Sequence, residues 1–172
     1  MAAHKFVKLV QYCHLLGIYG GIRLTQGRFG SRSEQILDWN QGNGIMVIHA
    51  TPGHVKFELD IQKEHTNRLN ILHGGTIASM VDLGGSLAVA SKGLFATGVS
   101  TDLNVTYINS GGKIGDTIRA EANCDKFGKM LAYTSITFYN GKDQLVARGS
   151  HTKYVALAWK DENNIVDELS PR

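Results

Sequence analysis

Cysteine is scarce in this chain of 172 residues, which has only Cys13 and Cys124. The two form no CxxC or metal-type spacing, so the sequence predicts neither a disulfide framework nor a zinc module, and a reducing compartment is the default. Long apolar runs are also lacking, and no stretch approaches the ~20 residues that cross a bilayer, so stable membrane insertion is not expected. His65, His73 and His151 have no tight ligand spacing, so no metal site is expected.

An excess of either charge is lacking too. Lysine and arginine together number 18 against 15 acidic residues, a formal net charge of +3. This balance is too small to indicate a nucleic-acid partner, although it suits an anionic ligand. A hydrophobic content of 42% over 172 residues is ordinary for one globular domain with a substantial core.

Acidic residues are absent from the first 33 positions, before Glu34. This basic stretch contains a short amphipathic helical pattern from Phe6 to Leu16. One interpretation is a mitochondrial targeting segment, although its serine content is low. The other is an N-terminal helix that packs on the domain of a cytoplasmic protein. The expected organisation is a basic extension over residues 1–43, one domain over 44–156 and a frayed polar tail over 157–172.

The hydrophobic pattern predicts one long helix among strands. In the second strand, Val55, Phe57, Leu59 and Ile61 alternate with charged residues, which indicates one buried face. Thr51-Pro52-Gly53-His54, Gly111-Gly112 and Asn140-Gly141 are turn signals. The fold class is therefore α+β, with a helix covering one face of a curved antiparallel sheet. The expected elements are strands at Ile45–His49, Val55–Ile61, Thr97–Ile108, Ile114–Lys126, Lys129–Tyr139 and Gln144–Ala156, and a helix at Gly75–Ser91.

The stretch from Glu64 to Ser86, EHTNRLNILHGGTIASMVDLGGS, carries the chemistry. Gly74 and Gly75 open the helix, so its first N–H groups are uncovered and the helix dipole favours negative charge there. Asp82 lies inside the helix, where an aspartate has no propensity advantage. Together these features offer an amide donor for an oxyanion and a carboxylate for a water molecule. The alternative is a capped core helix with Asp82 on its solvated face.

Several motifs in one order identify a family. HTNxxxxLHGG is followed by an aspartate nine positions after His73, then by VSTDLNVTYINS, GKMLAYTSITFYN and ARGSHTKYV. This set resembles the hotdog-fold acyl-CoA thioesterases over roughly residues 44–155. The resemblance implies a hotdog fold, in which a curved antiparallel sheet wraps around one long central helix. It also implies a homo-oligomer, in which two protomers join their sheets and two dimers form a tetramer, and it implies no cofactor.

The resemblance further assigns roles to five residues. The Gly74 N–H and the Asn67 side chain would polarise the thioester carbonyl or hold the water. Asp82 would act as the base or as the nucleophile, and Ser100 would orient the water. His73 would orient Asn67 or pack against its loop. In the family, the asparagine and glycine come from one protomer and the aspartate and serine from the other. Without the resemblance, Asn67 reads as a turn residue and Ser100 as an ordinary strand serine.

The function implied is hydrolysis of medium-chain, long-chain or aryl acyl-CoA to a carboxylic acid and free CoA, within fatty acid metabolism. By resemblance, Lys126, Lys129 and Lys153 would face the CoA phosphates. The alternatives are a non-catalytic acyl-CoA or lipid-binding protein of the same fold, and a hotdog hydratase or dehydratase. The complete set of site residues favours hydrolysis. The substrate contacts expected by resemblance are Tyr107, Lys126, Gly128, Lys129 and Tyr154.

Overall fold

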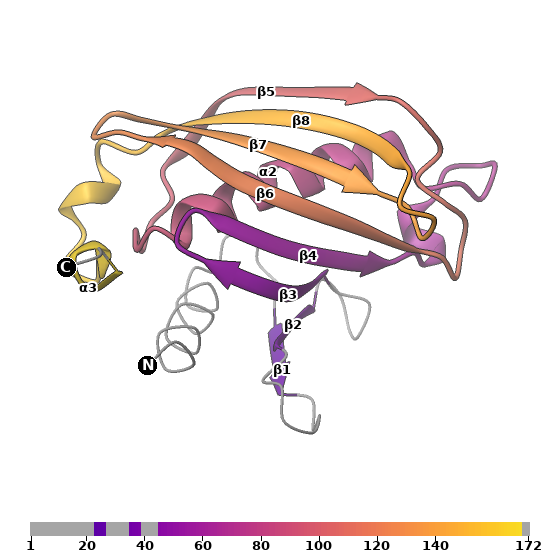
Figure 1. Cartoon of the computed structure of the whole chain (residues 1–172), viewed down its shortest axis with the longest axis horizontal. Helices are drawn as coiled ribbons and strands as arrows, with labels where there is room; N and C mark the ends of the chain where they lie inside the picture. The colour runs from indigo at the N-terminus through magenta and orange to yellow at the C-terminus, as the bar shows by residue number, and fades with distance from the viewer. Residues whose placement is uncertain (1–22, 27–34, 39–44, 170–172) are drawn as a thin grey trace.

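The structure is a computed structural model that describes residues 23–26, 35–38 and 45–169 (Figure 1). Most of the basic N-terminal segment, including the expected helix and the targeting interpretation, lies outside the described residues. Two short strands of the 1–43 extension are described, and they extend the sheet beyond the strands that the sequence predicts.

The described strands form one antiparallel sheet in the order β1-β2-β3-β4-β6-β7-β8-β5. Figure 1 shows the sheet curving over a single long helix, α2. Strand β8, the last in sequence, lies between β7 and β5, so β5 forms one edge of the sheet. The strands are β1 (Arg23–Gln26), β2 (Gln35–Asp38), β3 (Ile45–Thr51), β4 (His54–Asp60), β5 (Val99–Tyr107), β6 (Thr117–Phe127), β7 (Leu131–Tyr139) and β8 (Leu145–Tyr154). The helices are α2 (Gly74–Ala90), α3 (Val166–Leu169) and the 3-10 turns η1 (Lys63–His65) and η2 (Ala158–Lys160).

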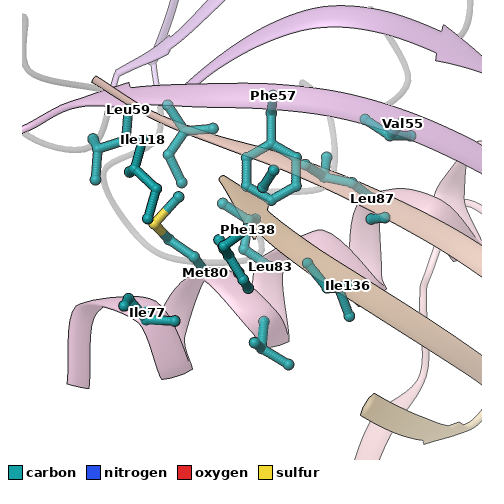
Figure 2. Packing of buried hydrophobic residues seen from close by; sticks show 14 of the residues in the cluster. Val55, Phe57, Leu59, Ile77, Met80, Leu83, Leu87, Ile118, Ile136 and Phe138 are labelled. Atoms are coloured by element: carbon teal, nitrogen blue, oxygen red, sulfur yellow. The ribbon is translucent and has the colours of Figure 1, made fainter. Parts of the chain in front are cut away.

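The core lies between the concave face of the sheet and α2. The alternation in β4 buries Val55, Phe57 and Leu59, as the sequence predicts, because side chains of a strand alternate between its two faces. Figure 2 shows these side chains meeting Met80 and Leu87 of α2, with Phe138 of β7 beside them. This packing fixes one face of α2, and hence the direction in which the other face presents its polar side chains.

The helix begins and ends within one residue of the prediction. At its start, the His73 side chain accepts a hydrogen bond from Gly75 N (2.8 Å). After its end, Gly93 adopts a φ of 99°, the left-handed conformation that stops many helices. Of the described residues, no helix is long and apolar enough to cross a membrane.

Two local expectations differ from the structure. The Asn140-Gly141 hairpin is present, but five residues separate the paired Tyr139 and Leu145, and the positive φ is at Asp143 (58°). The Asn140 side chain holds this wider loop by accepting from the backbone N–H of residues 142 and 144. The C-terminal tail is not frayed as far as Leu169: its backbone bonds to the turn that follows α2, with Ile165 N donating to Gly93 O at 2.9 Å.

Candidate active site

Asp82 projects from the interior of α2 toward residues of two other elements. Ser100, near the start of β5, donates its hydroxyl to Asp82 Oδ1 at 3.0 Å. His151 of β8 contacts both of these side chains, with its Nε2 2.9 Å from Ser100 Oγ and 3.1 Å from Asp82 Oδ1. The three side chains therefore form one hydrogen-bonded cluster. Asp82 is still 21% exposed, so its carboxylate can meet a ligand or water.

The surroundings of His151 favour the neutral form of its ring. It is fully buried, and burial lowers its pKa; the nearby Lys153 cation lowers it further, and the Asp82 carboxylate offsets part of the decrease. Nδ1 has no hydrogen-bond partner among the described residues. A bare acceptor nitrogen is the better fit there, because a buried N–H without a partner would be costly. We therefore assign the proton to Nε2, which donates toward Ser100 and Asp82.

A second polar pair joins the same two elements, four residues further along α2 and two residues further along β8. Lys153 of β8 is only 3% exposed and donates from Nζ to Ser86 Oγ of α2 at 3.0 Å. Burial lowers the pKa of Lys153, and the Asp82 carboxylate offsets part of that decrease. The expectation that Lys153 faces the CoA phosphates is wrong, because its side chain points into the protein against α2.

A pocket of about 770 Å³ opens beside these two pairs. That volume lies within the range typical of small-molecule sites. Asp82, Ser86, Ser100 and Lys153 form its polar wall. The other lining residues are Ala96, Thr97, Gly98, Val99, Leu157, Ala158, Lys160 and Asp161.

The start of α2 forms a separate polar group. The Nδ1 of His73 accepts a hydrogen bond from the N–H of Gly75. The His73 side chain is therefore a helix cap, and the Gly75 N–H is occupied. The Gly74 N–H has no partner among the described residues, whereas its carbonyl accepts the Tyr107 hydroxyl at 2.8 Å. A side chain at Gly74 would meet the Tyr107 ring at 3.3 Å. Tyr107 therefore fixes the helix start whose free N–H can meet an oxyanion.

Asn67 has the turn role that its residue type predicts. Its Oδ1 accepts the backbone N–H of Leu69 (2.8 Å) and of Ile71 (3.3 Å). This Asx-type turn fixes the amide plane and commits the oxygen, so the NH₂ end is the part that can donate to a ligand. The loop that carries Asn67 is joined to the helix start through His73 N, which donates to His65 O at 2.9 Å.

The remaining expected substrate contacts lie near the β6–β7 turn. Lys126 and Lys129 are exposed. Gly128 closes the turn by donating its N–H to Leu131 O at 3.0 Å, and its carbonyl accepts from Trp159 Nε1 at 3.1 Å. Tyr154 ends β8, paired with both neighbouring strands. These residues form a second region, distinct from the Gly74 end of the helix.

Comparison with known proteins places the chain in a family. A family model described as the thioesterase superfamily matches residues 69–147. A Schizosaccharomyces pombe protein, provisionally named as an esterase, is 48% identical over 72% of this chain and 76% of its own length. The chain belongs to the thioesterase superfamily.

Two further relatives agree with this assignment. Human acyl-coenzyme A thioesterase 13 is 40% identical over 64% of this chain and 79% of its own length. The crystal structure of zebrafish thioesterase superfamily member 2 superposes with a TM-score of 0.61 and 39% identity, covering 64% of this chain and 80% of that chain. The predicted hotdog fold of the thioesterase superfamily is thereby confirmed.

Within this thioesterase superfamily chain, sequence reasoning placed Asp82 and Ser100 in the site and missed His151 and Lys153 as partners of that site. Both lie on the inward face of β8, where Gly149, His151 and Lys153 alternate with outward residues. A polar residue at an inward strand position was the signal that could have found them. The described residues include no group of three or more histidine, cysteine, aspartate or glutamate side chains that could hold a metal ion.

Proposed function

We propose that this protein hydrolyses acyl-CoA thioesters to a carboxylic acid and free CoA. The observation that carries the proposal is the cluster of Asp82, Ser100 and His151 in the wall of the 770 Å³ pocket. Thioester hydrolysis needs a group that activates or replaces water, and a donor that stabilises the oxyanion. The names of the relatives, acyl-coenzyme A thioesterase 13 among them, support this substrate class.

Asp82 supplies the reactive carboxylate. Its Oδ1 accepts the Ser100 hydroxyl and lies beside His151 Nε2, and the partly exposed carboxylate can meet a water or a thioester carbon. In the base role Asp82 removes a proton from a water positioned near Ser100, and that water attacks the carbonyl carbon and displaces CoA as the thiolate. In the nucleophile role Asp82 attacks the carbonyl carbon itself and displaces the CoA thiolate, and water then hydrolyses the resulting mixed anhydride to release the acid and restore Asp82. In both roles, the Gly74 N–H and the Asn67 amide stabilise the oxyanion.

Two copies of the chain are needed to build one site. Gly74 and Asp82 are eight residues apart on one helix, which corresponds to ~12 Å along its axis. Both groups must act within ~3 Å of the same thioester carbonyl. One chain cannot bring them that close, so we propose that Gly74 and Asn67 of one protomer face Asp82 and Ser100 of its partner.

The edge strand β5 is the surface through which the two copies join in this proposal. It is exposed along almost its whole length, and Val99, Leu103 and Tyr107 are among its large exposed hydrophobic residues. An apolar edge of this kind is a template for pairing with another strand. Pairing of two such dimers into a tetramer stays a prediction.

Release of free thiol from short, medium, long and aryl acyl-CoAs tests the reaction. Asp82→Asn is expected to lower kcat by ~10²- to 10⁴-fold, because it removes the base but keeps the shape. Asp143→Asn is the matched control, since this exposed aspartate lies in the β7–β8 loop and pairs with Arg119, outside the cluster. An Asp82→Asn protein with wild-type turnover would refute the assignment of Asp82. Binding of CoA esters without turnover of any substrate would instead indicate a non-catalytic binding protein.

Mixing two inactive variants tests the shared site. Asn67→Ala and Asp82→Asn chains, co-expressed, form mixed dimers that have one site with both residues intact and one with neither. Activity should therefore reappear in the mixed protein at about half that of the wild type per mixed dimer. No recovery, with mixed dimers present by mass spectrometry, would show that each site lies within one chain.

A further inference from the structure

Two neighbouring polar pairs join α2 to β8. Asp82 and Ser86 are four residues apart, so they lie on one face of the helix. His151 and Lys153 are two residues apart, so they lie on one face of the strand. The first pair is Asp82 with His151 (3.1 Å), and the second is Ser86 with Lys153 (3.0 Å). The Lys153 ammonium group thus lies directly behind the reactive cluster.

Burial of the Lys153 side chain costs free energy, so we expect this residue to have a function. Lysine is almost never buried without a charged partner, because its ammonium group loses its hydration. Lys153 is 3% exposed, and it donates a hydrogen bond to a neutral hydroxyl, that of Ser86, which is itself 1% exposed. The side chain is also too deep to contact a phosphate at the surface. What it does reach electrostatically is the Asp82–His151 pair.

We propose that Lys153 is a positioning residue for the hydrolysis: anchored by Ser86, its buried ammonium group keeps the His151 ring neutral, so that the ring holds Asp82 and Ser100 through Nε2. The inference rests on the proposed thioesterase function. A fixed cation disfavours a second cation close by. A neutral His151 ring only donates a hydrogen bond from Nε2, whereas a protonated ring would form an ion pair with the Asp82 carboxylate and neutralise its charge.

The other charges near this pair are few. On β5, Asp102 acts on His151 and favours its protonation, against Lys153. After β8, Lys160 and Asp161 line the same pocket and carry opposite charges. On β7, the residues paired with Lys153 and His151 are Ala132 and Thr134, which do not titrate. Lys153 is therefore the buried cation that opposes protonation of His151 within the described residues.

The first test is the pH profile of kcat/KM for Lys153→Met, beside the wild type. Met keeps the length of the side chain and removes the charge. The acid limb of the profile should move to higher pH, because without the Lys153 cation the His151 ring takes up a proton at higher pH. Lys160→Met, which removes an exposed lysine from the same pocket, should leave the limb in place. An unmoved limb in Lys153→Met, or an equal shift in Lys160→Met, would overturn the proposal.

Ser86→Ala gives a second, milder variant in case Lys153→Met does not fold. It keeps the lysine and removes its anchor, so the acid limb should move in the same direction by a smaller amount. Thermal unfolding of each variant accompanies the profile. A Ser86→Ala protein that is folded and has the wild-type profile would contradict the role of the anchor, and with it the proposal.

Histidine NMR separates failure of this proposal from failure of the proposed function, because it needs no turnover. The His151 resonance, assigned by its loss in His151→Gln, should titrate at higher pH in Lys153→Met than in the wild type. If no acyl-CoA is hydrolysed but this shift is seen, the function fails and the electrostatic role of Lys153 stands. If hydrolysis occurs and His151 titrates at the same pH in both proteins, the role of Lys153 is wrong.

Discussion

The close approach of α2 to β8 makes Gly85→Ala a sensitive probe of the site. A Cβ atom at Gly85 would lie 2.5 Å from His151 Nδ1 and 2.6 Å from Thr134 Oγ1. Ordinary contact begins near 3.4 Å, so the ring has to move by about 0.9 Å. Thr134 cannot easily yield, because its hydroxyl is buried and donates to His151 O at 2.8 Å.

A shift of that size breaks the cluster. The contacts from His151 Nε2 to Ser100 and to Asp82, at 2.9 and 3.1 Å, would lengthen beyond hydrogen-bond distance. Misplacement of a catalytic group by ~1 Å costs on the order of 10²-fold in rate. The free energy of unfolding should change less. Overpacking lowers it by ~1–3 kcal/mol, whereas replacing a mid-helix glycine by alanine raises it by about 1 kcal/mol.

Gly84→Ala is the matched control. It makes the same change one position earlier in the same helix, but its Cβ would meet Phe57 Cζ at 2.9 Å, in the core and away from the cluster. Both variants are compared by thiol release from the best acyl-CoA substrate and by thermal unfolding. Gly85→Ala should lose ~100-fold in kcat/KM while Gly84→Ala stays within a few-fold of the wild type. Equal losses in the two variants, or full activity of Gly85→Ala, would refute the reasoning.

Two further predictions concern titratable groups. The pKa of His151 is lower in the folded state than its ordinary 6.5, so the unfolded chain binds the proton first, and stability should fall as pH decreases below about 6.5. The pKa of His65 is also lowered, so this residue makes stability depend on pH in the same direction. The check is therefore urea unfolding at pH 7.5 and 5.5 for both the wild type and His151→Gln. The loss of stability between the two pH values should be smaller in the variant, and an equal loss would contradict the contribution of His151. Burial raises the pKa of the Cys124 thiol to about 11, so in a Cys13→Ser background its alkylation at pH 8 should be on the order of 100-fold slower than that of a free thiol. Alkylation at the rate of glutathione would show that this thiol is not protected.

The strands and the helix were predictable because each depends on a pattern of residues that are neighbours in the sequence. Alternation in Val55–Ile61 and the turn at Pro52-Gly53 depend on neighbouring residues only, and the structure places β4 and its turn within one residue of the prediction. The Asn140-Gly141 loop was less predictable, because the Asn140 side chain bonds to two backbone N–H groups and opens a wider turn than the dipeptide alone requires.

The site was predictable only in part, because its partners are distant in sequence. Asp82 stood out as an aspartate inside a helix, and Ser100 came from the resemblance. His151 is 51 residues from Ser100, and only the pairing of β5 with β8 brings the two together. A register shift between Ser100 and Asp102 sets which side chains of β5 face inward at that point, and nothing in the local sequence marks it.

The order of the strands also sets the order in which the molecule can be made. Strands β3, β4, β6 and β7 pair in the sequence in which they leave the ribosome, whereas β5 waits for β8, the last strand to be synthesised. Asp82 and Ser100 are therefore translated long before the strand that carries His151. Because such long-range pairing is slow, the reactive cluster should close in a late step of folding. Premature termination between β7 and β8 would leave a chain that has most of the core residues but lacks His151 and the strand that pairs with β5.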